Sequence, residues 1–193
     1  MTGAGGGVVE FGPTGIRYRS YPYVGASVHP HGHGSTVDIR DVDRRRRPAR
    51  DPPPQRRDPV RLRRTDDLRA FCEEHAVPVR RRPDVWADLL EPFLDTEFTV
   101  ADDERTATRL HQAGLDRDEI ARIRAQVGDA MVAYNFGSML WEWVHLGLFD
   151  LLEAHSGNLA GERFRLAADD FAELYRKAMA VADRSYDQNS SQA

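Results

Sequence analysis

Apolar residues recur at helical spacing through most of the second part of the chain, and they predict about five to six helices. One strong apolar stripe covers 85–94. The capping box of Asp116 and Glu119 is the clearest local signal, and it predicts the start of a long helix. A very apolar helix is expected from about 139 to 154, and a last helix is expected to open at Asp170.

Short β-rich runs separated by turn residues occupy the N-terminal part. The runs 8–11 and 16–21 flank a Gly/Pro cluster at 12–15, and this arrangement predicts a β-hairpin. A third strand is expected at 36–40, where apolar and polar residues alternate. So few strands need other elements to cover one face. The predicted fold is therefore α+β, with a mainly α-helical C-terminal domain and a small N-terminal antiparallel β-element.

The composition changes between these two parts. Residues 40–64 contain 11 Arg and 5 Pro and almost no large apolar side chains. Such a segment buries too little apolar surface to offset its ordering entropy, so it is predicted to be a flexible linker. The expected organisation is a β-element at 1–39, this Arg/Pro-rich linker, a helical domain at 65–183 and a disordered tail at 184–193.

The net charge of -4 conceals two parts of opposite sign. Residues 1–82 hold 17 basic and 10 acidic residues, a net of +7, whereas residues 83–193 hold 10 basic and 21 acidic residues, a net of -11. The composition excludes collagen, a membrane channel and a disulfide-stapled mini-protein. Cys72 is the only cysteine, and the first residues lack the pattern of a signal peptide. We therefore expect a cytoplasmic protein with no membrane partner.

A first candidate site lies in the apolar helix expected from about 139. Glu142 and His145 are three residues apart and would share one face of that helix. Di-iron bundles use this Glu-x-x-His pair, but they use it twice and add two further Glu. Glu91, Asp95 and His111 could supply further ligands from other helices. The hypothesis is a divalent metal site, and the alternative is that Glu142 and His145 belong to a solvent-facing stripe.

A second candidate site is the tract that contains His29, His31 and His33. Residues at positions i, i+2 and i+4 of a strand point to one face, so three imidazoles could converge on a divalent metal such as zinc, nickel or copper. Pro30 and Gly32 between the histidines argue against a rigid strand. The alternative interpretation is a flexible surface loop.

A third candidate site is the arginine-rich stretch. Many of its charges lie in two clusters. One cluster is Arg44, Arg45, Arg46 and Arg47, and the other is Arg56 and Arg57. Mobile cationic arms neutralise phosphates and bind nucleic acid in a salt-dependent manner. They also bind acidic protein surfaces, and the C-terminal part of this chain is itself acidic. No aromatic residue interleaves the arginines, so stacking on single-stranded bases is not expected.

The chain has no P-loop, dinucleotide-binding glycine fingerprint, nucleophile elbow or paired Cys-x-x-Cys. The leading hypothesis is therefore a non-enzymatic protein-interaction or regulatory protein, with a homo-oligomer as its simplest assembly. One alternative is a metal-binding protein or metal-dependent enzyme that uses the Glu142/His145 pair or the histidine tract. The other is a nucleic-acid accessory protein that uses residues 40–64.

Overall fold

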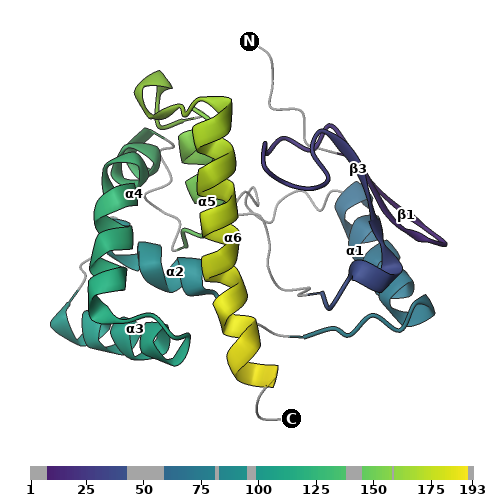
Figure 1. Ribbon diagram of the computed structural model, residues 1–193, viewed down its shortest axis with the longest axis horizontal. Coiled ribbons are helices and arrows are strands. Elements are labelled where there is room, and N and C mark those ends of the chain that lie inside the picture. Colours follow the sequence, from purple (N-terminus) through teal and green to yellow (C-terminus); the bar gives the residue numbers. More distant parts are fainter. Residues whose placement is uncertain are drawn as a thin grey trace. The chain divides into compact units, whose positions relative to one another are not determined.

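A computed structural model describes residues 8–42, 59–80, 83–94, 99–137, 145–157 and 159–190. The chain divides into two compact units, 1–81 and 82–193, and each is described by itself. The described residues form a three-stranded antiparallel sheet near the N-terminus and six helices, most of them in the second unit (Figure 1). The α+β fold class with a mainly helical C-terminal part is confirmed. The linker and tail boundaries proposed from the sequence stay predictions.

The sheet has the strand order β1-β2-β3, with β1 at Val8–Gly12, β2 at Gly15–Arg19 and β3 at His31–Ser35. The predicted hairpin is confirmed, because β1 and β2 pair antiparallel on either side of a tight turn. Phe11 lies opposite Ile16 in this pairing. Since opposite residues in an antiparallel pair share a face, the two side chains lie on the same side of the sheet.

The third strand does not lie at 36–40, where it was predicted. The strand β3 ends at Ser35, and Thr36–Asp38 forms the short 3-10 helix η1. The reason is the length of its neighbour: Ser35 lies opposite Gly15, the first residue of β2, so later residues have no strand to pair with. Val37, one of the apolar residues on which the predicted strand was based, is 88% exposed.

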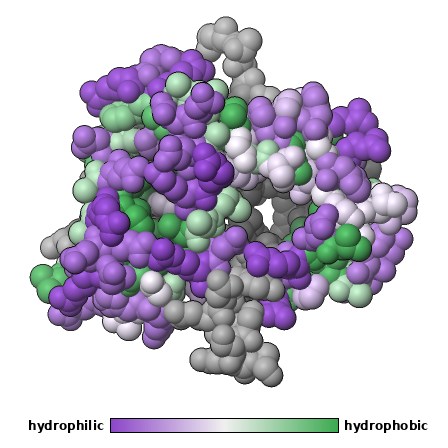
Figure 2. All heavy atoms as spheres, viewed as in Figure 1, coloured by the Kyte–Doolittle hydropathy of each residue, from purple (hydrophilic) through white to green (hydrophobic). Residues whose placement is uncertain are grey.

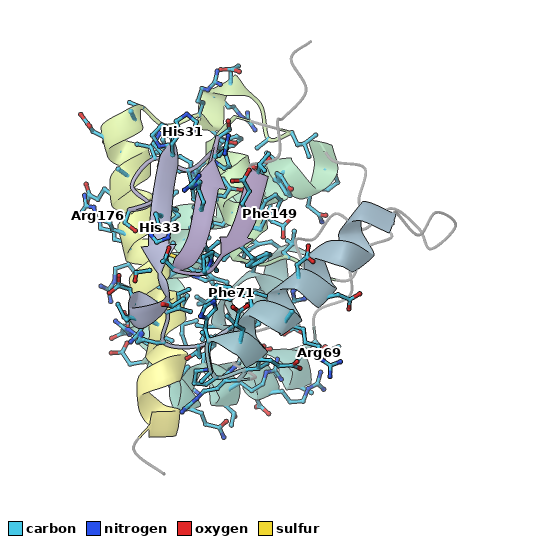
Figure 3. All side chains as sticks on the ribbon, turned by 90° about the vertical axis from the view of Figure 1, so that its right-hand side faces the viewer. His31, His33, Arg69, Phe71, Phe149 and Arg176 are labelled. Carbon is cyan, nitrogen blue, oxygen red and sulfur yellow. The ribbon has the colours of Figure 1, made fainter. Side chains whose placement is uncertain are left out.

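The inner face of the sheet is covered by α1, which spans Pro59–Glu74 (Figure 3). Phe71 of α1 is buried against Ile16, and its ring centroid lies 5.5 Å from that of Phe11. The helix begins inside the range 40–64 that was predicted to be a linker. Proline suits a first helical turn, where its missing N–H group is not needed. The remainder of that range, 43–58, lies outside the described residues.

A parallel bridge between Val42 and Val79 closes the first unit. The amide of Val42 donates to the carbonyl of Pro78 over 2.9 Å, and the amide of Arg80 donates to the carbonyl of Val42 over 3.0 Å. Cys72 is buried in the same apolar cluster as Phe71. The cluster therefore joins the sheet, α1 and the chain that follows the helix.

The second unit is built around α2, a short helix whose Leu89 and Leu90 are completely buried. The elements of this unit are α2 at Val85–Leu90, η2 at Glu91–Phe93, α3 at Val100–Gln112, α4 at Arg117–Gly137, α5 at Leu148–His155, η3 at Glu162–Phe164 and α6 at Ala168–Ser190. The helix α2 packs against α3, α4 and α6 (Figure 1). Trp86 fixes it to α6, because its indole Nε1 donates to the carbonyl of Ala178 over 2.9 Å.

The apolar helix predicted from about 139 to 154 is shorter than expected. The helix α5 begins at Leu148, and residues 145–147 before it are not helical. Asp150 sets this start, since its carboxylate accepts the backbone N–H of Gly147 over 2.9 Å. Residues 138–144 lie outside the described part of the chain.

The visible surface is mostly polar. Figure 2 shows hydrophilic residues over most of it, with smaller groups of apolar residues between them. Val132, Phe136 and Leu159 are among the large apolar residues that remain exposed. Within the described ranges, no helix combines the length and the apolar character needed to cross a membrane.

Candidate functional site

The structure describes His145 of the first candidate site but not Glu142. Glu142 lies outside the described residues, and His145 precedes α5. The His145 side chain is 58% exposed, and its Nε2 lies 3.5 Å from Oδ2 of Asp84. Hydrogen bonding to Asp84 raises the pKa of His145, although partial burial opposes this effect. A metal needs the neutral imidazole, so this geometry favours an ion pair.

Of the other proposed partners of that metal site, the structure describes Glu91 and His111, and each contacts another protein group. Asp95 lies outside the described residues. Glu91 accepts a hydrogen bond from the hydroxyl of Thr106 over 2.7 Å. His111 has its Nδ1 2.7 Å from the carbonyl oxygen of Leu115. Across the part of the chain that the structure describes, no group of three or more His, Cys, Asp or Glu side chains could hold a metal ion.

The three histidines of the second candidate site take separate partners. His31 and His33 are exposed on β3, whereas His29 precedes the strand and its Nδ1 lies 2.7 Å from the carbonyl oxygen of Tyr21. The Nδ1 of His31 accepts the backbone N–H of Ser20 over 3.1 Å. A neutral His31 therefore carries its proton on Nε2, which makes that nitrogen a hydrogen-bond donor rather than a metal ligand.

The arginines of the third candidate site all lie outside the described residues. They are Arg44, Arg45, Arg46, Arg47, Arg56 and Arg57. A nucleic-acid or acidic-partner contact through this segment stays a prediction from the sequence.

A buried carboxylate that was not proposed as a site connects α4 to α5. Asp150 is 1% exposed and accepts the hydroxyl of Tyr134 on Oδ1 over 3.1 Å, while Oδ2 accepts the amide of Gly147. Burial raises the pKa of Asp150. Both carboxylate oxygens hold protein groups and the side chain is shut off from solvent, so Asp150 positions α5 and does not meet a ligand.

The end of α5 positions the segment that carries η3. The amide of Leu166 donates to the carbonyl of His155 over 3.1 Å, and Nδ1 of His155 lies 3.4 Å from the carbonyl oxygen of Phe164. Burial lowers the pKa of His155. These contacts fix η3 relative to the helices of the second unit.

A shallow pocket lies between the C-terminal half of α4 and η3. Its volume is about 630 Å³. The residues that line it, which we call the α4–η3 surface, are Asp129, Val132, Ala133, Phe136, Arg163 and Phe164. Phe136 is 71% exposed at the end of α4, and Val132 lies one helical turn before it.

The position of these residues follows from the way α4 packs. Val127, Met131 and Tyr134 point into the core, so Val132 and Phe136 lie on another face of the helix. The returning chain at Leu159 approaches the end of α4 at Gly137, next to this face. A Cβ atom added to Gly137 would lie 2.2 Å from the carbonyl oxygen of Leu159. Only a residue without a side chain permits this approach.

The pocket combines apolar walls with two opposite charges. The guanidinium carbon of Arg163 lies 4.5 Å from the centre of the Phe164 ring, within the range of a cation–π contact. Asp129 supplies a carboxylate at the same surface. Aromatic residues and arginine are enriched at protein interfaces and among the residues that dominate binding energy. The arrangement suits an apolar side chain with charged neighbours.

None of the six lining residues was singled out from the sequence. A signal was present for two of them, since Val132 and Phe136 are four residues apart and lie off the apolar stripe that ends at Tyr134. The contribution of Arg163 and Phe164 could not be found in this way, because it depends on where the returning chain packs.

Comparisons with known proteins give no guide to the function, which is therefore inferred from the geometry of the site. No protein family, no curated protein and no solved structure matches this chain.

Proposed function

We propose that this chain is a non-enzymatic interaction protein that binds a second copy of itself through the α4–η3 surface. The observation that carries the proposal is the 71% exposure of Phe136 beside a pocket with apolar walls. Exposed aromatic surface is unfavourable in water and becomes favourable when a partner covers it. The phenyl ring and the pocket beside it would supply the centre of such a contact.

A second copy is the occupant that the charges of this surface favour. In a twofold dimer the same patch occurs on both partners, so a residue i that meets j is matched by j meeting i. The α4–η3 surface carries a projecting ring, a pocket, the acidic Asp129 and the basic Arg163. Phe136 of each copy would enter the pocket of the other, and Asp129 would face Arg163 across the interface.

The chemistry of the lining supports binding rather than catalysis. A covalent mechanism needs a nucleophile with a base held beside it. The α4–η3 surface offers one carboxylate and one guanidinium group, and its six lining residues include no Ser, Cys or Lys that could act as a nucleophile. We further propose a cytoplasmic location, supported by the single cysteine, which excludes an intramolecular disulfide. Fractionation of cells that express the chain tests this location.

The molar mass in solution tests the self-association. Sedimentation velocity over a concentration series is expected to show a monomer–dimer equilibrium for the wild type. Phe136→Ala is expected to weaken the dimer by at least about tenfold, as truncation of a central aromatic residue does at other interfaces. Val100→Ala is the matched control, because Val100 is 78% exposed at the start of α3 and lies outside the surface. A wild type that stays monomeric, or equal effects of the two variants, overturns the proposal.

Charge exchange tests the twofold geometry. Asp129→Arg and Arg163→Asp are each expected to weaken the dimer, because each places like charges opposite one another. The double variant restores an opposite-charge pair and is expected to recover most of the wild-type affinity. A double variant no better than either single variant shows that the two residues do not face each other.

A further inference from the structure

The outer face of the N-terminal sheet carries polar residues from all three strands, and those of β1 and β2 are charged. Side chains alternate between the two faces of a strand. Phe11, Ile16 and Tyr18 pack towards α1, so their neighbours in sequence point to the opposite face. These outward residues are Glu10 of β1, Arg17 and Arg19 of β2, and His31 and His33 of β3, and all five are exposed. We call them the outer sheet face; Figure 3 labels the two histidines on β3.

The strand register places arginine beside histidine twice. Arg19 lies opposite His31, and Arg17 lies opposite His33. Glu10 is the carboxylate of this face, and its Oε2 lies 3.1 Å from a guanidinium nitrogen of Arg19. No carboxylate among the described residues forms an ion pair with Arg17. The outer sheet face therefore has positive charge that its own acidic residue does not neutralise.

The hydrogen-bonding groups of this face are mainly donors. A guanidinium group offers five N–H donors and no acceptor. His31 adds another donor, because the amide of Ser20 occupies its Nδ1 and leaves the proton on Nε2. His33 has its Nε2 3.5 Å from the hydroxyl oxygen of Thr14. The charged guanidinium donors form their strongest hydrogen bonds with phosphate and carboxylate oxygens.

We propose that the outer sheet face binds the phosphate backbone of a nucleic acid. The spacing of its arginines favours this polyanion. Two residues of an antiparallel strand rise by about 6.8 Å. Each strand of B-form DNA carries one phosphate per about 3.4 Å of helix axis, so its negative charges are closely and regularly spaced. Arg17 and Arg19, two residues apart on β2, can therefore each contact a phosphate of the same strand.

Two other features define the kind of binding. None of the strand residues that point to the outer sheet face is Phe, Tyr or Trp, so bases have no such ring to stack on. Binding to this face is therefore expected to be independent of base sequence. The net charge of +7 on residues 1–82 attracts polyanions over a longer range. This activity lies beyond the proposed self-association and uses residues of the other unit.

Fluorescence anisotropy with a labelled DNA duplex of mixed sequence tests the proposal on the full chain. Arg17→Gln is expected to weaken binding severalfold at about 50 mM salt and to reduce the slope of log affinity against log salt by about 1. Glu10→Gln removes the carboxylate of the face and is expected to strengthen binding. Arg69→Gln is the matched control, since it removes the same charge from the exposed surface of α1.

The outcomes separate this face from general charge and from acidic proteins. Equal losses for Arg17→Gln and Arg69→Gln, or no gain for Glu10→Gln, overturn the proposal. Labelled poly-glutamate that binds as tightly as the duplex, with the same dependence on Arg17, assigns the face to acidic polypeptides and likewise overturns it. Circular dichroism spectra of each variant show whether the fold is retained, so that a loss of binding is assigned to the side chain.

Discussion

The hydroxyl of Tyr134 donates a hydrogen bond to Oδ1 of Asp150 across 3.1 Å, and both side chains are buried. The contact joins the last turn of the long helix α4 to the first turn of α5. A buried carboxylate is costly to ionise, and burial accordingly raises the pKa of Asp150. This pair offers direct tests of how the second unit is stabilised.

The stability of the protein is expected to depend on pH through Asp150. Its pKa is higher in the folded than in the unfolded state, so the folded state binds the proton more tightly. The resulting stabilisation is complete below the unfolded pKa of about 3.9 and is lost as pH rises through the folded pKa. Asp150→Asn cannot titrate. The free energy of unfolding of the wild type relative to this variant should therefore fall between about pH 4 and pH 7.

Urea unfolding at the two pH values measures the effect. Asp118→Ser is the control, because it removes a carboxylate that is exposed to solvent. A difference between wild type and Asp150→Asn that is the same at both pH values contradicts the expectation.

Removal of the Tyr134 hydroxyl is expected to destabilise the fold. Tyr134→Phe keeps the ring in the core but leaves Oδ1 of Asp150 without this donor, at a cost of about 1 to 3 kcal/mol in the free energy of unfolding. The cost should be smaller in the background of Asp150→Asn, because the carboxylate is no longer present. A double-mutant cycle measured by urea unfolding gives the coupling energy. Strictly additive effects mean that the two groups do not interact.

The contact between His145 and Asp84 is expected to appear as a shifted titration. Asp84 raises the pKa of His145, so the stabilisation is complete below the unfolded value of about 6.5 and is lost as pH rises through the folded pKa. Asp84→Asn should lower the midpoint of the His145 ring resonances in an NMR titration. Asparagine retains the N-cap role of this position, in which Oδ1 accepts the amide of Ala87.

The effect of this pair on stability should be small. The His145 side chain is more than half exposed, and ion pairs at such sites contribute less than about 1 kcal/mol. Added salt should reduce the difference in the titration midpoint between wild type and variant. An unchanged midpoint in Asp84→Asn shows that the two side chains are not paired in solution.

Gly137→Ala is expected to be destabilising, although the same change inside a helix ordinarily stabilises it by about 1 kcal/mol. The new methyl group would lie 2.2 Å from the carbonyl oxygen of Leu159, a backbone atom that cannot move without shifting the returning chain. Overpacking of this kind costs about 1 to 3 kcal/mol. Gly128→Ala is the comparison, because its methyl group would meet the side chain of Phe93 at 3.0 Å. Thermal unfolding should show the larger loss for Gly137→Ala, and a stabilised variant contradicts the close approach.

The elements that could be predicted from the sequence are those whose cause is local. The hairpin follows from two short runs around a turn, and α4 begins at Arg117, directly after the predicted cap. The carboxylate of Asp116 accepts the amide of Glu119 over 2.7 Å, as the capping signal requires. In both cases the residues that decide the structure lie within one turn of each other.

The errors arose where distant residues decide the structure. The segment His31–Ser35 has no β-branched residue before its turn into η1, and it becomes a strand because β2 offers it a partner. The α4–η3 surface could not be predicted for the same reason. Its second wall is formed by Arg163 and Phe164 of η3, and a sequence pattern within α4 contains no information about where η3 packs.

The bridge between Val42 and Val79 has a consequence for the order of folding. The first unit joins Ile16 of the hairpin with Phe71 of α1, and it closes only when Val79 reaches Val42. Contacts between residues so far apart in sequence form slowly, because the chain must lose much conformational freedom before they form. During synthesis the hairpin therefore leaves the ribosome well before its core is complete. Until α1 follows, the apolar side of the sheet has no helix to cover it.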